Sequence, residues 1–312
     1  MRRRSYSAIR HLDAPYDGPR VAGAEFLSTV YVWDLKARKR VSAFETPLDF
    51  GGRRLAISPR GDVCAVGSWT YGGLACYDAD SAEVTYARGD LKQLQFVSFS
   101  PDGKRLYCGR ETGPMSVLDA GTGADIAKYP YTDFAYCSPH QPIELLSRRR
   151  KGSIELRTVG GKRIATLTRT GFKIFDVAFG TDRLCMSEAG GNYFRRDEPG
   201  PLLRCVETQA GAELWRYAPR RNWWIEHVAY SPRAMAFFGL ERNYIRRFRD
   251  RLLRFDYDSG KVSLVARTER RSDTQVFCSR GEALLTSEGE LIDVFTGVTR
   301  RAFRFPYNRD TF

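Results

Sequence analysis

The sequence is poor in the residues that build most catalytic and metal sites. It has three histidines among 312 residues, His11, His140 and His227, and they lie far apart in the chain. A transition-metal site usually takes two or three His ligands, or His together with carboxylates. The chain also lacks a Gly-x-Ser-x-Gly nucleophile motif and a Gly-x-x-x-x-Gly-Lys-Ser/Thr phosphate loop. We therefore expect no catalytic residue, no bound metal, no cofactor and no enzymatic activity.

Long apolar runs are missing as well. No stretch approaches the roughly 18 consecutive apolar residues that would cross a membrane. Residues 1–7 carry the charges of a signal peptide, but no apolar region follows them. We therefore expect no membrane contact and a cytoplasmic location. The cysteines have no zinc-site spacing, and we interpret them as reduced, buried residues of a reducing compartment: Cys64, Cys76, Cys108, Cys137, Cys185, Cys205 and Cys278.

Negative charge is in short supply. Lys and Arg outnumber Asp and Glu by 50 to 37, and the formal net charge is +13. A positive balance of this size favours acidic proteins, nucleic acid or anionic surfaces as partners. Hydrophobic residues make up 42% of the chain, which is enough for a large folded core.

One short pattern recurs seven times along the chain. Each copy is a short apolar stretch that ends in an acidic or polar residue and a turn, and successive copies end 37 to 49 residues apart. A period of about 40–45 residues is typical of the four-stranded blades of a β-propeller. The repeat therefore predicts an all-β fold, with residues 1–312 forming a single β-propeller of seven four-stranded blades. The copies are residues 30–34, 74–78, 115–119, 154–158, 203–207, 252–256 and 290–293.

Short β-prone runs that end in Pro and Gly turns lie between these copies. Ile-Ser-Pro-Arg-Gly-Asp at 57–62 and Phe-Ser-Pro-Asp-Gly-Lys at 99–104 are the clearest examples. Together with the Trp33-Asp34 pair, they resemble the WD-repeat family and its bacterial WD-like relatives over about residues 28–305. The resemblance implies a seven-bladed propeller, a scaffold that hosts many activities. The chain lacks the family's Gly-His pairs and has a single Trp-Asp pair, so ordinary β packing must hold the blades.

The spacing also predicts where the blades lie. With the strands of a blade labelled a (innermost) to d (outermost), blade 1 falls at about 5–45 and blades 2–7 at about 53–305. Blade 1 is the least regular, because residues 13–19 break it with two prolines and a glycine. It takes its inner strands from residues 6–27, or else the N-terminal segment supplies the outer strand of blade 7. The sequence leaves both alternatives open.

A propeller sorts its loops onto two faces because its strands are antiparallel. The b–c and d–a loops emerge on one side, here called the b–c face, and the a–b and c–d turns emerge on the other, the a–b face. In the predicted blades the b–c face carries an excess of Lys and Arg over Asp and Glu, whereas the a–b face is close to neutral. Such an asymmetry steers acidic partners.

Four clusters form the predicted basic, aromatic-rich surface on the b–c face. Aromatic anchors beside arginines are typical of interface hot spots. The residues are Arg148, Arg149, Arg150 and Lys151; Arg195 and Arg196; Arg220, Arg221, Trp223 and Trp224; and Arg242, Tyr244, Arg246, Arg247, Phe248 and Arg249.

Two of these clusters also have a structural interpretation. In this interpretation, Trp223 and Trp224 begin an a strand and pack between blades, and the arginines of residues 242–251 are solvated side chains of an arginine-rich chain. Residues 243–253 are the one segment with a helical period, and a helix there would place Ile245, Phe248 and Leu252 on one stripe, with arginines on the other faces.

We predict a non-catalytic protein-interaction scaffold that presents this surface to an acidic protein partner, as a subunit of a larger complex. The first alternative is a nucleic-acid-binding propeller that uses the same face, with an affinity that falls steeply with salt. The second is an enzyme or small-ligand propeller with its site at the mouth of the central channel. That alternative requires Asp176, Glu226 and His227 to converge there.

Overall fold

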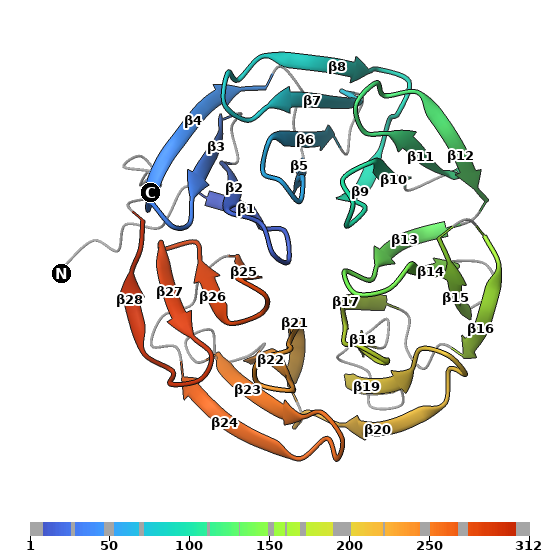
Figure 1. Ribbon diagram of the computed structural model, residues 1–312, viewed down its shortest axis with the longest axis vertical. Coiled ribbons are helices and arrows are strands. Elements are labelled where there is room, and N and C mark those ends of the chain that lie inside the picture. Colours follow the sequence, from blue (N-terminus) through green and yellow to red (C-terminus); the bar gives the residue numbers. More distant parts are fainter. Residues whose placement is uncertain are drawn as a thin grey trace.

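The chain forms a closed ring of β-sheets. A computed structural model describes residues 9–25, 29–46, 53–68, 72–110, 113–130, 132–148, 153–159, 161–168, 173–189, 201–220, 222–243, 250–267 and 274–303. All regular elements in these ranges are β-strands, and they form seven four-stranded sheets around a central axis (Figure 1). The predicted all-β, seven-bladed propeller is confirmed.

The first four blades follow one another along the chain. Blade 1 contains β1 (Ile9–Asp13), β2 (Arg20–Glu25), β3 (Thr29–Asp34) and β4 (Lys39–Glu45). Blade 2 contains β5 (Arg53–Ile57), β6 (Val63–Ser68), β7 (Leu74–Asp78) and β8 (Val84–Arg88). Blade 3 contains β9 (Leu94–Phe99), β10 (Arg105–Arg110), β11 (Met115–Asp119) and β12 (Asp125–Tyr129). Blade 4 contains β13 (Thr132–Cys137), β14 (Ile143–Arg148), β15 (Ser153–Thr158) and β16 (Arg163–Thr168).

The last three blades complete the ring. Blade 5 contains β17 (Lys173–Phe179), β18 (Arg183–Ala189), β19 (Leu202–Glu207) and β20 (Glu213–Tyr217). Blade 6 contains β21 (Trp223–Ser231), β22 (Ala236–Asn243), β23 (Arg251–Asp256) and β24 (Val262–Arg267). Blade 7 contains β25 (Gln275–Cys278), β26 (Ala283–Thr286), β27 (Glu290–Asp293) and β28 (Thr299–Arg301).

Each blade is built from four consecutive strands, and this arrangement decides how the ring closes. Blade 1 takes its inner strands from β1 and β2, and blade 7 ends in its own outer strand, β28. Of the two alternatives left open by the sequence, the structure has the first. No strand ladder among the described residues joins blade 7 to blade 1, so side-chain packing and loop contacts across this boundary close the ring.

The seven repeats of the sequence are the third strands of the blades, β3, β7, β11, β15, β19, β23 and β27. The acidic residue that ends most copies caps the turn into the next strand. Asp119 Oδ1 accepts hydrogen bonds from the backbone N–H groups of Gly121 at 3.1 Å and Thr122 at 2.9 Å. Asp293 makes two such bonds, both of 2.9 Å, in blade 7. The repeated aspartate therefore serves turn formation, as expected for Asp at such positions.

Glycine follows in several of these turns because the backbone there is left-handed and a neighbouring blade is close. Gly260 has a φ of 66°, and a Cβ atom at this position would lie 2.5 Å from the ring of Trp215 in blade 5. Gly123 has a φ of 73° and makes the same approach to Tyr86 of blade 2. The turn glycines thus let aromatic side chains of the preceding blade pack against the turn.

The hydrophobic core lies between the blades. The buried apolar residues form seven clusters, and each cluster joins two neighbouring blades. Between blades 1 and 2, the rings of Phe44 and Tyr77 stack with centroids 4.4 Å apart. Between blades 7 and 1, the cluster includes Ile9, Trp33 and Leu285. Burial of these faces is the dominant favourable term in holding the ring together.

The cysteines take part in this packing. All seven are free, and six of them are buried. Burial raises the pKa of the Cys76 thiol to about 12 and that of Cys278 to about 11. These thiols therefore stay protonated and pack as small apolar groups.

The described residues include no helix long and apolar enough to cross a membrane.

Candidate functional site

Much of the predicted basic surface falls outside the residues that the structure describes. Arg148 ends β14, and only its backbone is described. The side chains of Arg220, Trp223, Trp224 and Arg242 are described in full. The remaining predicted residues lie outside the described ranges: Arg149, Arg150, Lys151, Arg195, Arg196, Arg221, Tyr244, Arg246, Arg247, Phe248 and Arg249.

Arg220 and the two tryptophans lie where blade 5 leads into blade 6. Arg220 is exposed, and its carbonyl oxygen accepts a hydrogen bond from the N–H of Trp223 at 2.9 Å, where β21 begins. The guanidinium of Arg251 lies 4.4 Å from the ring centroid of Trp223. The ring of Trp224 stacks on Phe175 of blade 5, with centroids 6.5 Å apart. Both tryptophans are therefore anchored in the propeller, while each keeps part of its surface exposed.

Arg242 is buried rather than exposed. Its side chain is 5% exposed, and its guanidinium forms ion pairs with Glu226 and with Asp250, the latter at 3.2 Å. The same Asp250 oxygen accepts a hydrogen bond of 3.4 Å from Gln275 of blade 7. Both faces of β22 are covered, since Leu240 and Glu241 are 0% exposed and Arg242 is 4% exposed, so the arginine is buried by its place on this inner strand. This placement removes Arg242 from the exposed surface.

Residues 243–253 do not form one continuous helix. Asn243 ends β22, and β23 begins at Arg251. Leu252 is fully buried in that strand, in the core cluster between blades 6 and 7. Residues 244–249, including Ile245 and Phe248 of the expected apolar stripe, lie outside the described ranges.

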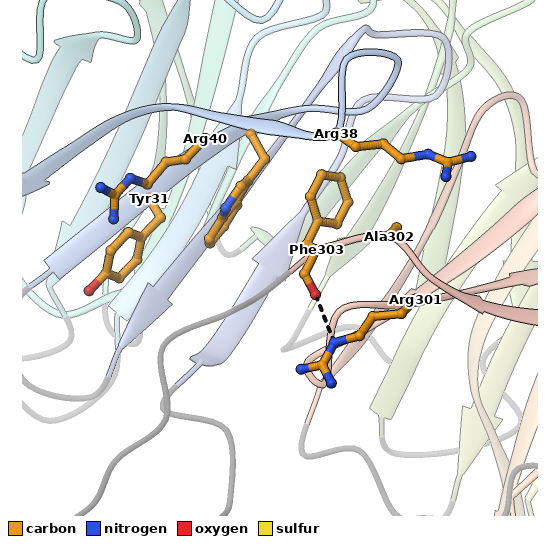
Figure 2. Close-up of a pocket in the computed structure, with 7 residues that line it drawn as sticks. Tyr31, Arg38, Arg40, Arg301, Ala302 and Phe303 are labelled. Atoms are coloured by element: carbon orange, nitrogen blue, oxygen red, sulfur yellow. Dashed lines mark hydrogen bonds between the residues drawn. The ribbon is translucent and has the colours of Figure 1, made fainter.

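A basic groove lies between blades 1 and 7 (Figure 2). It was not predicted from the sequence, and we call it the seam groove. Its volume is about 610 Å³. Arg38 and Arg40 come from the β3–β4 hairpin of blade 1, and Arg301 ends β28 of blade 7. The groove is lined by Tyr31, Trp33, Arg38, Arg40, Arg301, Ala302 and Phe303.

The seam groove has an aromatic wall. The rings of Tyr31 and Trp33 stack with centroids 5.5 Å apart, and the ring of Phe303 lies 6.2 Å from that of Trp33. Trp33 and Phe303 are each 3% exposed, so the wall is held rigidly by the core cluster between blades 7 and 1. The guanidinium of Arg40 lies 5.9 Å from the Tyr31 ring centroid. Arginine and aromatic surface thus meet at one place.

The charge of the seam groove is positive. Among the described residues, no Asp or Glu forms an ion pair with Arg38 or Arg40. Arg301 Nε donates a hydrogen bond to the carbonyl oxygen of Phe303 at 3.4 Å, and its side chain remains exposed. The hairpin also exposes Lys36 and Lys39. The signal in the sequence is two short basic runs, which become neighbours only when blades 1 and 7 meet.

Tyr31 contributes a neutral hydroxyl to this groove. The hydroxyl donates a hydrogen bond to Glu25 at 2.7 Å. Burial, followed by this hydrogen bond, raises the pKa of Tyr31 to about 12, so the phenol stays protonated at neutral pH.

The centre of the ring holds two adjoining cavities. An outer one of about 680 Å³ lies among the a–b turns, and an inner one of about 380 Å³, which we call the axial cavity, lies among the innermost strands. Asp13, Tyr16 and Cys137 line both. The loop between β1 and β2 extends toward the ring centre (Figure 1), and it carries Tyr16.

Two of the three residues singled out for a channel site meet in the axial cavity. His227 Nδ1 lies 3.6 Å from Asp176 Oδ2, and both side chains line the cavity. Burial lowers the pKa of His227, but the Asp176 carboxylate and the charge of Glu226 outweigh burial, and the pKa is raised overall. Glu226 does not join them, because its carboxylate pairs with Arg242.

A second carboxyl group faces the same space from blade 1. Asp13 Oδ2 accepts a hydrogen bond of 2.8 Å from the backbone N–H of Ile57 in blade 2. Burial raises the pKa of Asp13 to about 6, although hydrogen bonds from the N–H groups of Ile57 and Ala14 act in the opposite direction. The charge of Asp176 also raises it.

The other two histidines lie elsewhere. His140 lies on the a–b face between two aromatic side chains, with ring centroids 5.0 Å from Tyr16 and 5.6 Å from Tyr230. Burial lowers the pKa of His140. His11 lies in β1. The described part of the chain contains no group of three or more His, Cys, Asp or Glu residues placed to hold a metal ion.

Solved structures of similar fold come from proteins of different kinds. One is titled Kuenenia stuttgartiensis hydrazine synthase, with a TM-score of 0.68, 14% identity and coverage of 96% of each chain. The WD40 repeats of RRP9 give a TM-score of 0.68 and 12% identity, covering 91% of this chain and 88% of theirs. U3-55K gives 0.67 and 12%, covering 99% and 94%.

Known protein families and curated proteins give no match to the sequence. At identities of 12–14% the structural likeness shows the propeller fold alone. WD40 repeats and the structure titled as an enzyme share that fold, so the site itself must carry the functional argument.

Proposed function

We propose that this propeller is a non-catalytic protein-interaction scaffold that binds an acidic segment of a partner protein, as a subunit of a larger complex. The seam groove is the observation that carries the proposal. It combines a rigid aromatic wall with Arg38 and Arg40, which form no ion pair with a described Asp or Glu. Interfaces concentrate their binding energy at such aromatic and arginine positions.

The chemistry of the groove selects a segment that is both acidic and apolar. Arg40 and Arg301 approach from the two blades, and arginine pairs with planar carboxylates through two parallel hydrogen bonds. The partly exposed ring of Tyr31, which stacks on the buried Trp33, offers apolar surface beside them. A peptide with carboxylates flanking an aromatic or aliphatic side chain would complement both features.

The exposed arginine of the b–c face belongs to the same proposal. Arg220 lies beside the partly exposed Trp223 and Trp224, and the net charge of +13 steers acidic surfaces toward the molecule. The fold shared with WD40 repeat structures supports a scaffold role by analogy. The seven free thiols support a reducing compartment, for which we propose the cytoplasm.

A peptide-binding assay tests the seam groove. The probe is a fluorescein-labelled peptide of alternating Asp and Phe residues, and its control replaces every Asp with Asn. Arg40→Glu combined with Arg301→Glu should weaken binding of the acidic peptide at least about tenfold. The matched control is Lys162→Glu with Arg163→Glu, which makes the same charge change on the exposed outer hairpin of blade 4.

The outcomes separate the alternatives. Equal loss of affinity in the two double variants would show that net charge, and not the groove, attracts the peptide. Equal binding of the Asp and Asn peptides would show that the groove does not select an acidic segment. If an oligo(dT) strand displaces the peptide and its affinity falls linearly in log–log form between about 50 and 200 mM salt, the nucleic-acid alternative replaces the proposal.

A further inference from the structure

The axial cavity has a charge opposite to that of the protein as a whole. The chain carries 50 Lys and Arg residues, yet none of those whose side chains the structure describes lines this cavity. Asp13 of β1 and Asp176 of β17 line it, and these two strands lie across the ring from each other (Figure 1). His227, the one basic side chain in the lining, is turned to Asp176. Among the described side chains that line the axial cavity, the charged groups are therefore these two carboxylates and the imidazole paired with one of them.

The carboxylates are held in place before any ligand arrives. Asp176 Oδ2 accepts a hydrogen bond of 2.9 Å from the N–H of Val228 in blade 6, as Asp13 does from the N–H of Ile57 in blade 2. These bonds span blade boundaries, so each side chain is fixed by two rigid sheets. A carboxylate accepts up to about four hydrogen bonds, and both retain acceptor capacity toward the cavity.

Solvent reaches these side chains from inside the ring. The side chains of His227 and Asp176 are 30% and 25% exposed, although both residues lie on innermost strands. Since innermost strands face the axis, this exposed surface borders the axial cavity. The polar groups are therefore accessible to a small molecule.

Aromatic side chains complete the lining. Tyr16, Phe175, Tyr230 and Phe277 come from four blades around the cavity. The face of an aromatic ring carries negative electrostatic potential and attracts ammonium groups within about 6 Å. Aromatic faces and carboxylates together favour an organic cation over an anion or a neutral sugar.

We propose that the axial cavity binds a small organic cation, an ammonium group on a short aliphatic body. The ammonium group lies between the carboxylates of Asp13 and Asp176, with the aromatic rings around its alkyl groups. The volume of about 380 Å³ equals roughly a dozen water molecules at about 30 Å³ each, which limits the ligand to a small metabolite or a single side chain. This inference is independent of the seam groove.

Access runs through the outer cavity on the a–b face. Tyr16 lines both cavities, and its loop is held to blade 7 by two contacts with Arg280. The backbone N–H of Arg280 donates to the carbonyl oxygen of Tyr16 at 2.6 Å, and its guanidinium pairs with Asp17 at 2.6 Å.

Calorimetric titration with a matched pair of probes tests the proposal. Choline is the cation, and 3,3-dimethylbutan-1-ol is its neutral isostere, with the same shape and no charge. At pH 7.5, well above the pKa of Asp13, choline should bind at least about tenfold more tightly than the alcohol. Methylammonium and putrescine extend the panel to smaller and longer cations.

Substitutions place the binding in the cavity. Asp13→Asn and Asp176→Asn keep an oxygen for the inter-blade hydrogen bonds, and each should weaken choline binding about tenfold while leaving the alcohol unchanged. Phe277→Leu tests the aromatic contribution without touching those bonds, so the test survives if an Asn variant fails to fold. The control Glu83→Gln removes an exposed carboxylate of blade 2 and should change nothing.

Two results would overturn the proposal. One is that no cation of the panel binds at concentrations up to about 10 mM. The other is that choline and its neutral isostere bind equally, or that choline binding survives all three cavity substitutions. Because the seam-groove variants leave the cavity intact, failure of one proposal does not affect the test of the other.

Discussion

Arg280 of blade 7 and Asp17 of blade 1 form an ion pair of 2.6 Å across the closing boundary of the ring, although 263 residues separate them in the chain. Their side chains are 58% and 56% exposed. Exposed pairs of this kind contribute about 0–1 kcal/mol, because solvent screens the charges and both side chains lose freedom. The ion pair positions the β1–β2 loop but supplies little of the stability of the closed ring.

Packing of the buried aromatic cluster between blades 7 and 1 should supply most of the free energy that keeps the ring closed. Trp33 is 3% exposed and packs in the cluster between blades 7 and 1. We expect Trp33→Ala to lower the free energy of unfolding by about 3–5 kcal/mol, measured by urea denaturation. Arg280→Gln should lower it by less than about 1 kcal/mol. Similar losses in the two variants would contradict this division.

The turn glycines provide a second stability prediction. Gly260→Ala introduces a Cβ atom 2.5 Å from the Trp215 ring at a φ of 66°, and we expect a loss of about 2–3 kcal/mol in thermal or urea unfolding. Gly103→Ala is the matched control, since its φ of 71° imposes the same backbone strain while the nearest atom lies 3.5 Å away. It should lose about 1 kcal/mol. Equal losses would show that strain, and not packing, requires glycine.

The pH dependence of stability should report on Asp13. Its pKa in the folded protein is about 6, above the ordinary value of 3.8, so folding favours the protonated form. This contribution is fully present below about pH 4 and is lost as the pH rises through 6. Relative to the natural protein, Asp13→Asn should therefore gain stability between about pH 4 and 6 and stay level above that range, in urea denaturation at several pH values.

Asp78→Asn should give the opposite trend. Hydrogen bonds from the backbone N–H groups of Ser81 and Asp80 lower the pKa of Asp78, so its carboxylate contributes stability that is lost as the pH falls. The stability of the variant relative to the natural protein should therefore fall as the pH rises toward about 4, and stay level above that pH. The same slope in both variants would mean that the substitutions act through packing rather than through charge.

The buried arginine provides a fourth test. Asp250→Ala removes one of the partners of Arg242 at a position where both side chains are at most 5% exposed, and we expect a loss of about 3 kcal/mol in unfolding free energy. Asp80→Ala is the comparison, because it breaks the more exposed pair with Arg20 and should lose less than about 1 kcal/mol. A small effect of Asp250→Ala would indicate that Glu226 alone neutralises Arg242.

The repeat was readable in the sequence because its physics is local. The aspartate that caps a c–d turn bonds to N–H groups two and three residues ahead, as Asp119 does with Gly121 and Thr122, so the same few residues reappear in each blade. The blade order follows from the repeat spacing. The fold could therefore be predicted without any knowledge of long-range contacts.

The candidate site depends on contacts that no local pattern reveals. The sequence predicts Arg242 on the surface, because it lies in an arginine-rich segment. Only its place on β22 and its ion pair with Asp250 show that it is buried. Arg40 and Arg301 line one groove because the ring closes between the first and last blades. Asp13 and Asp176 face one cavity because both lie on innermost strands. In each case the decisive partner is distant in the chain.

No strand ladder among the described residues crosses the boundary that the seam groove spans. A ligand in this groove would therefore hold the first and last blades together. A segment that contacts Arg40 on one blade and Arg301 on the other can bind only while the two blades are together. By mass action such a partner raises the melting temperature in proportion to the logarithm of its free concentration. Binding of the partner and the thermal stability of the propeller would then be governed by the same equilibrium.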